Sequence, residues 1–191
     1  MKLDNTVVVF KINNTKHLSV IQRDQVFVTQ NGTIEHNDID SLPSVVKTSQ
    51  DYEYDVYIPT FDEFVLLMKR GPQIIYPKDI GSIIISGNIS KFSNILEVGT
   101  GSGALTLYLS LILETSSNLI TLDESSKNQR RAKKTIDRFI SSSHSEKKFS
   151  KIEYLNLKFS DFIFNDFSQK VDTIITDIPE PWEFFDSNSV K

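Results

Sequence analysis

The spacing of hydrophobic residues changes character near residue 58. Before that point, short runs of β-branched and aromatic residues alternate with Asn, Asp, Gly and Pro, which is typical of a small antiparallel sheet or barrel. Taken alone, this segment fits a folding appendage and a recognition module equally well. The strands expected here are 6–10, 18–22, 25–29, 33–35, 45–48 and 53–58.

A helical period begins after residue 59. Thr60 and Glu63 have the spacing of a capping box, in which the Thr hydroxyl accepts the Glu amide and the Glu carboxylate accepts the Thr amide. Apolar residues follow at helical spacing, and the Gly-Pro pair at 71–72 is expected to end this helix. Pro77 suits the first turn of a second helix, because that turn leaves its N–H unused.

From residue 94 onward, strands and helices alternate. Strands separated by helices imply a parallel, doubly wound sheet with right-handed crossovers. We therefore predict a small β domain over 1–58 and an α/β domain over 59–191. The expected strands are 94–98, 118–122, 152–157 and 171–176, and the expected helices are 103–114 and 126–141.

Composition narrows the class of protein. The 191 residues include 21 Lys+Arg and 25 Asp+Glu, a net charge of −4, and 39% are hydrophobic. These values fit a globular, intracellular protein with no membrane span. The absence of cysteine excludes disulfides, thiolate zinc sites and cysteine nucleophiles, and the scattered histidines predict no metal site. The acidic balance disfavours non-specific coating of nucleic acid but allows a local basic patch.

The strongest local signal is a glycine-rich turn between a buried strand and a helix. Gly99, Gly101 and Gly103 alternate in Leu-Glu-Val-Gly-Thr-Gly-Ser-Gly-Ala. Glycines allow positive φ and close approach to a ligand, and a helix N-terminus offers unpaired N–H groups. Since Gly99, Gly101 and Ala104 also satisfy the dinucleotide pattern G-x-G-x-x-G/A, the turn alone leaves the ligand open.

Two acids around this turn bear on the ligand. Asp123 ends the next expected strand, ~20 residues on, where an acid bonds ribose hydroxyls. That requirement is common to NAD and S-adenosylmethionine. Glu97 precedes the first glycine and suits a ligand with an ammonium group, which NAD lacks. Glu97 therefore favours S-adenosylmethionine over NAD.

A stiff acidic loop follows the last expected strand. It reads Asp177-Ile178-Pro179-Glu180-Pro181-Trp182, and its two prolines fix φ. Asp177 is expected to project toward the glycine turn, and this acid–proline–aromatic loop suits an enzyme acting on a planar nitrogenous base. The simpler alternatives are a helix cap for Asp177 and core packing for Trp182.

Together these segments resemble the tRNA adenine-N1-methyltransferase family, whose members modify adenosine 58 in the T loop. The resemblance rests on residues 64–79, on the turn at 96–103, on Asp123 and on the loop 177–182. It implies a Rossmann-like S-adenosylmethionine-dependent methyltransferase fold, with 1–58 as the small N-terminal all-β domain. The intact glycine turn indicates the catalytic type of chain.

The resemblance also implies roles for individual residues. Asp177 and Tyr76 are expected to act on the target base, and Asp161 to contact the adenine of the cofactor, although a turn residue is an equal alternative there. The full set of expected cofactor contacts is Gln73, Glu97, Gly99, Thr100, Gly101, Ser102, Gly103, Asp123, Asp161 and Asp177.

Partners and extent follow from the same resemblance. It implies tRNA as substrate, a cytoplasmic location, and a homo-tetramer or dimer of dimers. Members of the family continue beyond the catalytic loop with further strands, so we expect the C-terminal strands to be missing here and the last strand to have an open edge. A methyltransferase with another substrate and a non-catalytic binding subunit remain alternatives.

A basic run lies in the helix expected over 126–141. It consists of Lys127, Arg130, Arg131, Lys133 and Lys134. Such a run is usually a solvated helix face, and contact with RNA is the alternative. The two differ in their salt dependence, since phosphate contacts weaken as ionic strength rises.

Overall fold

The computed structural model describes residues 3–68, 73–142, 149–162 and 171–184. They form two compact units, one from the described residues of 1–69 and 137–145, the other from those of 70–136 and 146–191. The domain division at residue 58 stays a prediction. No helix among the described residues is both long and apolar enough to cross a membrane.

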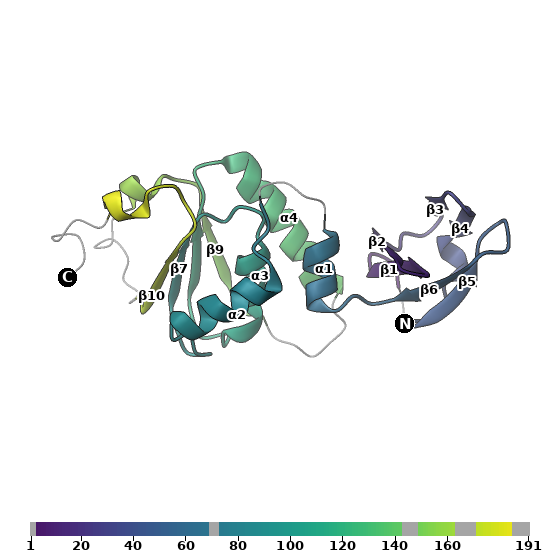
Figure 1. The fold of residues 1–191 in the computed structure, drawn as a ribbon, viewed down its shortest axis with the longest axis horizontal. Coiled ribbons are helices and arrows are strands. Elements are labelled where there is room, and N and C mark those ends of the chain that lie inside the picture. Colours follow the sequence, from purple (N-terminus) through teal and green to yellow (C-terminus); the bar gives the residue numbers. More distant parts are fainter. Residues whose placement is uncertain (1–2, 69–72, 143–148, 163–170, 185–191) are drawn as a thin grey trace. The chain divides into compact units, whose positions relative to one another are not determined.

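The first unit is built on an antiparallel sheet with the strand order β2-β1-β6-β5, accompanied by a separate β3–β4 hairpin (Figure 1). Its core gathers nine buried hydrophobic side chains, and the ring of Phe10 on β1 stacks on Phe27 of β3 at 4.1 Å. The strands are β1 Val7–Ile12, β2 Thr15–Val20, β3 Val26–Thr29, β4 Gly32–Glu35, β5 Ser44–Lys47 and β6 Glu53–Tyr57.

All six predicted strands of this unit are present, but the first two meet at a tighter turn than expected. Ile12 pairs with Thr15, so only Asn13 and Asn14 connect β1 to β2. Asn13 has a φ of 51°, which Asn tolerates better than most residues. The turn lets β1 extend to Ile12 and β2 begin at Thr15, where the sequence pattern predicted 6–10 and 18–22.

Helix α1 (Phe61–Leu67) begins with the predicted capping box. The Thr60 amide donates to Glu63 Oε2 at 3.1 Å, and the Glu63 amide donates to Thr60 Oγ1 at 3.4 Å. Lys16 and the Tyr57 hydroxyl donate to the other oxygen of Glu63. Burial alone would raise the pKa of Glu63, but the hydrogen bonds from Lys16, Thr60 and Tyr57 lower it to about 2. The cap therefore keeps its charge at any ordinary pH.

The second unit contains the predicted parallel sheet, with the strand order β10-β7-β8-β9. Its expected strands and helices are all found, most within one or two residues of the predicted limits. The elements are α2 Pro77–Ser86, β7 Ile95–Val98, α3 Ala104–Ile112, β8 Leu119–Leu122, α4 Ser126–Ser142, β9 Ile152–Leu155, the short helix η2 Phe159–Asp161, β10 Thr173–Thr176 and the short helix η4 Pro181–Phe184.

Both faces of the central strands are covered, as a parallel sheet requires. Every residue of β7 and β8 is buried. On one face, Ile95 and Leu119 pack with Ile80 of α2 and Leu105 of α3. On the other face, a second cluster includes the phenylalanine of η2 at position 159 and the one at 162. Among the described residues, β10 pairs with β7 alone and is only half-buried.

We expect opposite effects from alanine at two glycines of this unit. Gly81 lies inside α2 with nothing within 4 Å of an added Cβ, so Gly81→Ala should stabilise the fold by ~0.5–1 kcal/mol. Gly103 caps α3 with a φ of +81°, and its Cβ would lie 2.9 Å from the Ala132 Cβ. Gly103→Ala should cost roughly 2–4 kcal/mol. Urea unfolding measures both, and equal effects would contradict the packing described here.

Candidate active site

The carboxyl ends of three parallel strands meet at one edge of the sheet. The amides of Gly99 and Thr100, just after β7, both donate to the Leu122 carbonyl at the end of β8, at 2.8 and 2.9 Å. On the other side of β7, the Asp177 amide donates to the Val98 carbonyl at 2.9 Å. The predicted glycine turn, the end of β8 and the predicted acidic loop are therefore neighbours.

Packing within the protein requires glycine at two positions of the turn. Gly99 has a φ of +102°, and a Cβ there would lie 2.7 Å from the Asp177 carbonyl oxygen. Gly103 is closed in by Ala132 and Ile136 of α4. The sequence interpretation attributed these glycines to the approach of a ligand. The structure adds a second cause, since the turn must admit the start of the acidic loop on one side and α4 on the other.

Glu97 is a buried acid beneath this turn. It is only 2% exposed, and the Thr106 hydroxyl of α3 donates to its Oε2 at 2.6 Å. Burial raises the pKa of Glu97 to about 7, and the charges of Asp177 and Asp123 act in the same direction. Hydrogen bonds from Thr106 and Thr121 oppose this rise without cancelling it. The site therefore holds a carboxyl group that is half-protonated near neutral pH.

Three buried threonines connect Glu97 to the turn, and the sequence analysis missed two of them. Thr121 of β8 hydrogen bonds to Glu97, and its hydroxyl lies 2.7 Å from that of Thr100. Thr100 also lies within hydrogen-bonding distance of the Leu122 carbonyl, at 3.2 Å. Thr106 and Thr121 could have been noticed, because each places a hydroxyl among the mostly apolar residues of a buried element.

Asp123 is held by the glycine turn. Its Oδ2 accepts the Gly101 amide at 2.9 Å and its Oδ1 accepts the Ser125 amide at 2.8 Å. The Asn156 side chain donates to the Asp123 carbonyl at 2.6 Å. A carboxylate offers about four acceptor positions, so about two remain for other donors. These bonds fix the orientation of Asp123 and leave it able to accept two hydroxyl groups.

The acidic loop is open to solvent. Asp177 is exposed, and the helical turn η4 begins only at Pro181, so a helix-cap role for Asp177 is excluded. Trp182 is 69% exposed, which shows that core packing was the wrong interpretation for it. An acid and a flat aromatic surface are therefore presented on the same loop, beside the glycine turn.

Gln73, Tyr76, Asp161 and Ser102 are predicted site residues that show no hydrogen bond to Glu97, Asp123 or Asp177 within the described part of the chain. Gln73 and Tyr76 are exposed just before α2, Tyr76 at its N-cap. Asp161 is exposed in η2 and accepts the Ser160 hydroxyl at 3.1 Å. Ser102 accepts the Ala104 amide within the turn. No set of three or more His, Asp or Glu among the described residues has a metal-binding arrangement.

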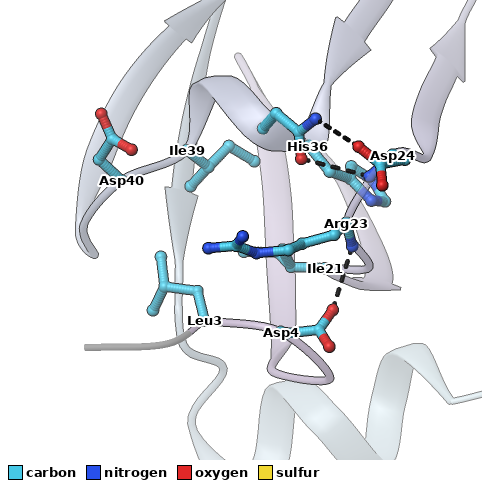
Figure 2. A pocket seen from close by; sticks show the side chains of 9 residues that line it. Leu3, Asp4, Ile21, Arg23, Asp24, His36, Ile39 and Asp40 are labelled. Atoms are coloured by element: carbon cyan, nitrogen blue, oxygen red, sulfur yellow. Dashed lines mark hydrogen bonds between the residues drawn. The ribbon is translucent and has the colours of Figure 1, made fainter.

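The first unit contains a separate polar hollow of about 400 Å³ (Figure 2). Asp4, Asp24 and Asn37 of its lining make hydrogen bonds within the fold. Asp4 accepts the Arg23 amide at 3.0 Å, while the Asn37 side chain donates to Asp24 at 2.9 Å and accepts the Asp24 amide at 3.2 Å. These contacts hold the β2–β3 connection, which gives Asp4, Asp24 and Asn37 a structural role.

We expect Glu97 to make stability depend on pH. Its pKa is about 7 in the folded chain against an ordinary value of 4.5, so the folded state holds the extra proton between these values. The contribution of Glu97 to the free energy of unfolding should be fully present below pH 4.5. It should be lost as the pH rises through 7, which lowers the free energy of unfolding by up to about 3 kcal/mol. Glu97→Gln should flatten this slope in urea unfolding measured from pH 5 to 8. An identical slope in both proteins would contradict the buried acid.

Two known proteins of similar sequence are tRNA methyltransferases. A tRNA (adenine(57)-N(1)/adenine(58)-N(1))-methyltransferase TrmI from Methanocaldococcus jannaschii is 30% identical over 171 residues, which cover 82% of this chain and 60% of that protein. A Thermus thermophilus tRNA (adenine(58)-N(1))-methyltransferase TrmI is 37% identical over 86 residues, 44% of this chain and 34% of that protein. The chain thus spans less than two thirds of the length of these relatives.

Two solved structures are similar in fold. A SAM-dependent O-methyltransferase from Thermotoga maritima has a TM-score of 0.81 at 22% identity, over 96% of this chain and 66% of that one. The tRNA (m1A58) methyltransferase TrmI from Aquifex aeolicus has a TM-score of 0.71 at 26% identity, over 95% of this chain and 68% of that one. The fold is the expected Rossmann-like methyltransferase fold with a small N-terminal β region. Since the family model described as "tRNA methyltransferase complex GCD14 subunit" matches residues 54–190, the chain belongs to that family.

Proposed function

We propose that this chain carries the cofactor and base sites of an S-adenosylmethionine-dependent tRNA (adenine-N1)-methyltransferase that acts on adenosine 58 of the T loop. The observation that carries the proposal is the meeting of Glu97, Asp123 and Asp177 at one edge of the sheet, around the glycine turn. The names of the relatives from Methanocaldococcus jannaschii and Thermus thermophilus support the same reaction.

The residues present fit S-adenosylmethionine. Glu97 is a buried carboxyl with no cation among its described partners, and the ammonium of the cofactor would supply one. Asp123 has acceptor positions left for the two hydroxyls of a ribose. Glu97 is therefore proposed to hold the amino-acid end and Asp123 the ribose. The turn Gly99, Thr100, Gly101, Ser102 and Gly103 would lie between them, with Gln73 and Asp161 as further contacts.

Asp177 is proposed to act on the target base. When bound, the cofactor supplies the methyl group as an electrophilic sulfonium substituent. The Asp177 carboxylate accepts a hydrogen bond from the N6–H of adenine, which raises electron density at N1 and stabilises the positive charge that develops on the ring. No base has to remove a proton, because neutral adenine has none at N1. Orientation of the two reactants can contribute ~7–11 kcal/mol to such a displacement.

Aromatic side chains would hold the extruded base. Tyr76 is 45% exposed and Trp182 69% exposed, so both side chains are accessible to a base from outside. Taking a base out of its stack costs only a few kcal/mol, which one aromatic contact of ~1–3 kcal/mol can largely offset. We assign the stacking role to Tyr76, beside α2.

The relatives named above are longer than this chain. For the whole protein we propose a cytoplasmic homo-tetramer or dimer of dimers.

Mass analysis of nucleosides tests the proposal. The protein is incubated with unmodified tRNA and methyl-labelled S-adenosylmethionine, and the digested RNA is separated by chromatography. The expected labelled nucleoside is 1-methyladenosine. Label on another base or atom would reject the substrate assignment, and a protein that binds no cofactor would favour the non-catalytic alternative.

Replacing Asp177 should separate binding from turnover. Asp177→Asn keeps the shape of the side chain but removes its charge, so we expect turnover to fall ~10²–10³-fold, as for loss of one group that stabilises a transition state. Cofactor affinity, measured by calorimetry, should change little. Glu180→Gln is the matched control, since it removes an exposed acid from the same loop. Equal turnover in the two variants would contradict the role of Asp177.

A further inference from the structure

Helix α4 presents basic side chains on its outer face. Gln129 and Ala132 form its inner face; the Gln129 amide donates to the Leu155 carbonyl at 3.0 Å, and Ala132 packs against Gly103. Both are buried, and the basic residues between and beside them are exposed. The exposed basic residues are Lys127, Arg130, Arg131, Lys133 and Lys134.

The outer face of α4 carries a concentration of positive charge that is not balanced by acids within it. The chain as a whole carries −4, yet the eight positions 127–134 hold five cations and no acid. Like charges three and four residues apart on a helix repel one another. Among the described residues, the ion pairs are made elsewhere, by Lys11, Lys16, Lys47 and Lys91.

One of the five cations already has a partner. The Lys133 ammonium lies 5.4 Å from the centre of the Tyr154 ring, a cation–π distance. The charged groups of the other four make no ion pair with the described residues. We call Lys127, Arg130, Arg131 and Lys134 the α4 basic face. The four positive charges of this face repel one another, and an external polyanion would relieve that repulsion. A solvated helix with alternating charges has no such repulsion to relieve.

The position of the α4 basic face relates it to the candidate site. Helix α4 starts at Ser126, three residues after Asp123, so its first turn lies at the edge of the sheet where the strands end (Figure 1). From Lys127 to Lys134 the helix advances ~10 Å away from that edge. A nucleic acid with one base at the edge has phosphates on either side of it, and these would meet cations along α4.

We propose that the α4 basic face binds the sugar–phosphate backbone of the RNA whose base enters the site. This inference rests on the proposed function, because it takes tRNA as the polyanion. Arg130 and Arg131 can each form two parallel hydrogen bonds to a phosphate, and Lys127 and Lys134 act as point charges. The face contributes affinity that does not depend on sequence, while selection of the base occurs at the strand ends.

The test is the triple variant Lys127→Gln/Arg131→Gln/Lys134→Gln, whose three sites follow one side of the helix. We expect its tRNA affinity at low salt to fall tenfold or more. The slope of log K against log salt should become shallower by ~0.7–0.9 for each phosphate that the variant no longer neutralises. In turnover, KM for tRNA should rise while kcat at saturating tRNA stays within about twofold, because the reacting groups are untouched.

Two controls make the result specific. Lys127→Arg/Arg131→Lys/Lys134→Arg keeps the charge and should keep the salt slope of the unaltered protein. Lys133→Gln removes the neighbouring cation that Tyr154 holds and should have a much smaller effect on the salt slope. If the unaltered protein binds and methylates tRNA but the triple variant keeps the same affinity and slope, this inference is wrong and the proposed function stands. If the unaltered protein binds no tRNA, both are wrong.

Discussion

The candidate site depends on how closely the end of β10 can approach the end of β7. The Asp177 amide bonds to the Val98 carbonyl, and the Asp177 carbonyl oxygen then lies only 2.7 Å from where any Cβ at residue 99 would stand. Gly99 is the residue that permits this approach. Without it, the acidic loop could not follow β7 so closely, and Asp177 would lie farther from Glu97 and Asp123. The chemistry proposed here begins with that packing constraint.

Glu97 lies at the same edge of the sheet, and packing alone does not explain a buried acid there. A buried carboxyl costs stability once it is charged, and an apolar residue of similar size in a protein interior avoids that cost. The Thr106 and Thr121 hydroxyls bond to Glu97 and stabilise its charged form, whereas the negative charges of Asp177 and Asp123 disfavour it. These hydroxyls reduce the cost only in part. A cationic ligand would offset most of the remaining cost of burying this charge, which is a physical reason for an acid at this position.

The sequence predicted what depends on local pattern and missed what depends on long-range packing. Strand and helix periods located every element of the parallel sheet, and the Thr60–Glu63 spacing predicted a real capping box. Thr121 was missed because threonine is common in strands, and its partner Glu97 lies on a different strand. The exposure of Trp182 could not be foreseen either, since large aromatic residues usually pack in cores. The domain boundary and the individual site roles stay predictions.

The glycine turn also determines which side of α4 faces outward. Gly103 leaves room for Ala132, whose Cβ would lie 2.9 Å from a Cβ at residue 103, and Gln129 bonds to the end of β9. With those two side chains fixed inward, a helix of 3.6 residues per turn must direct Lys127, Arg131 and Lys134 toward solvent. The packing that closes the proposed cofactor turn thus also orients the cations proposed to hold the RNA. The two proposed sites share one packing contact, because a Gly103 substitution that displaced α4 would shift both.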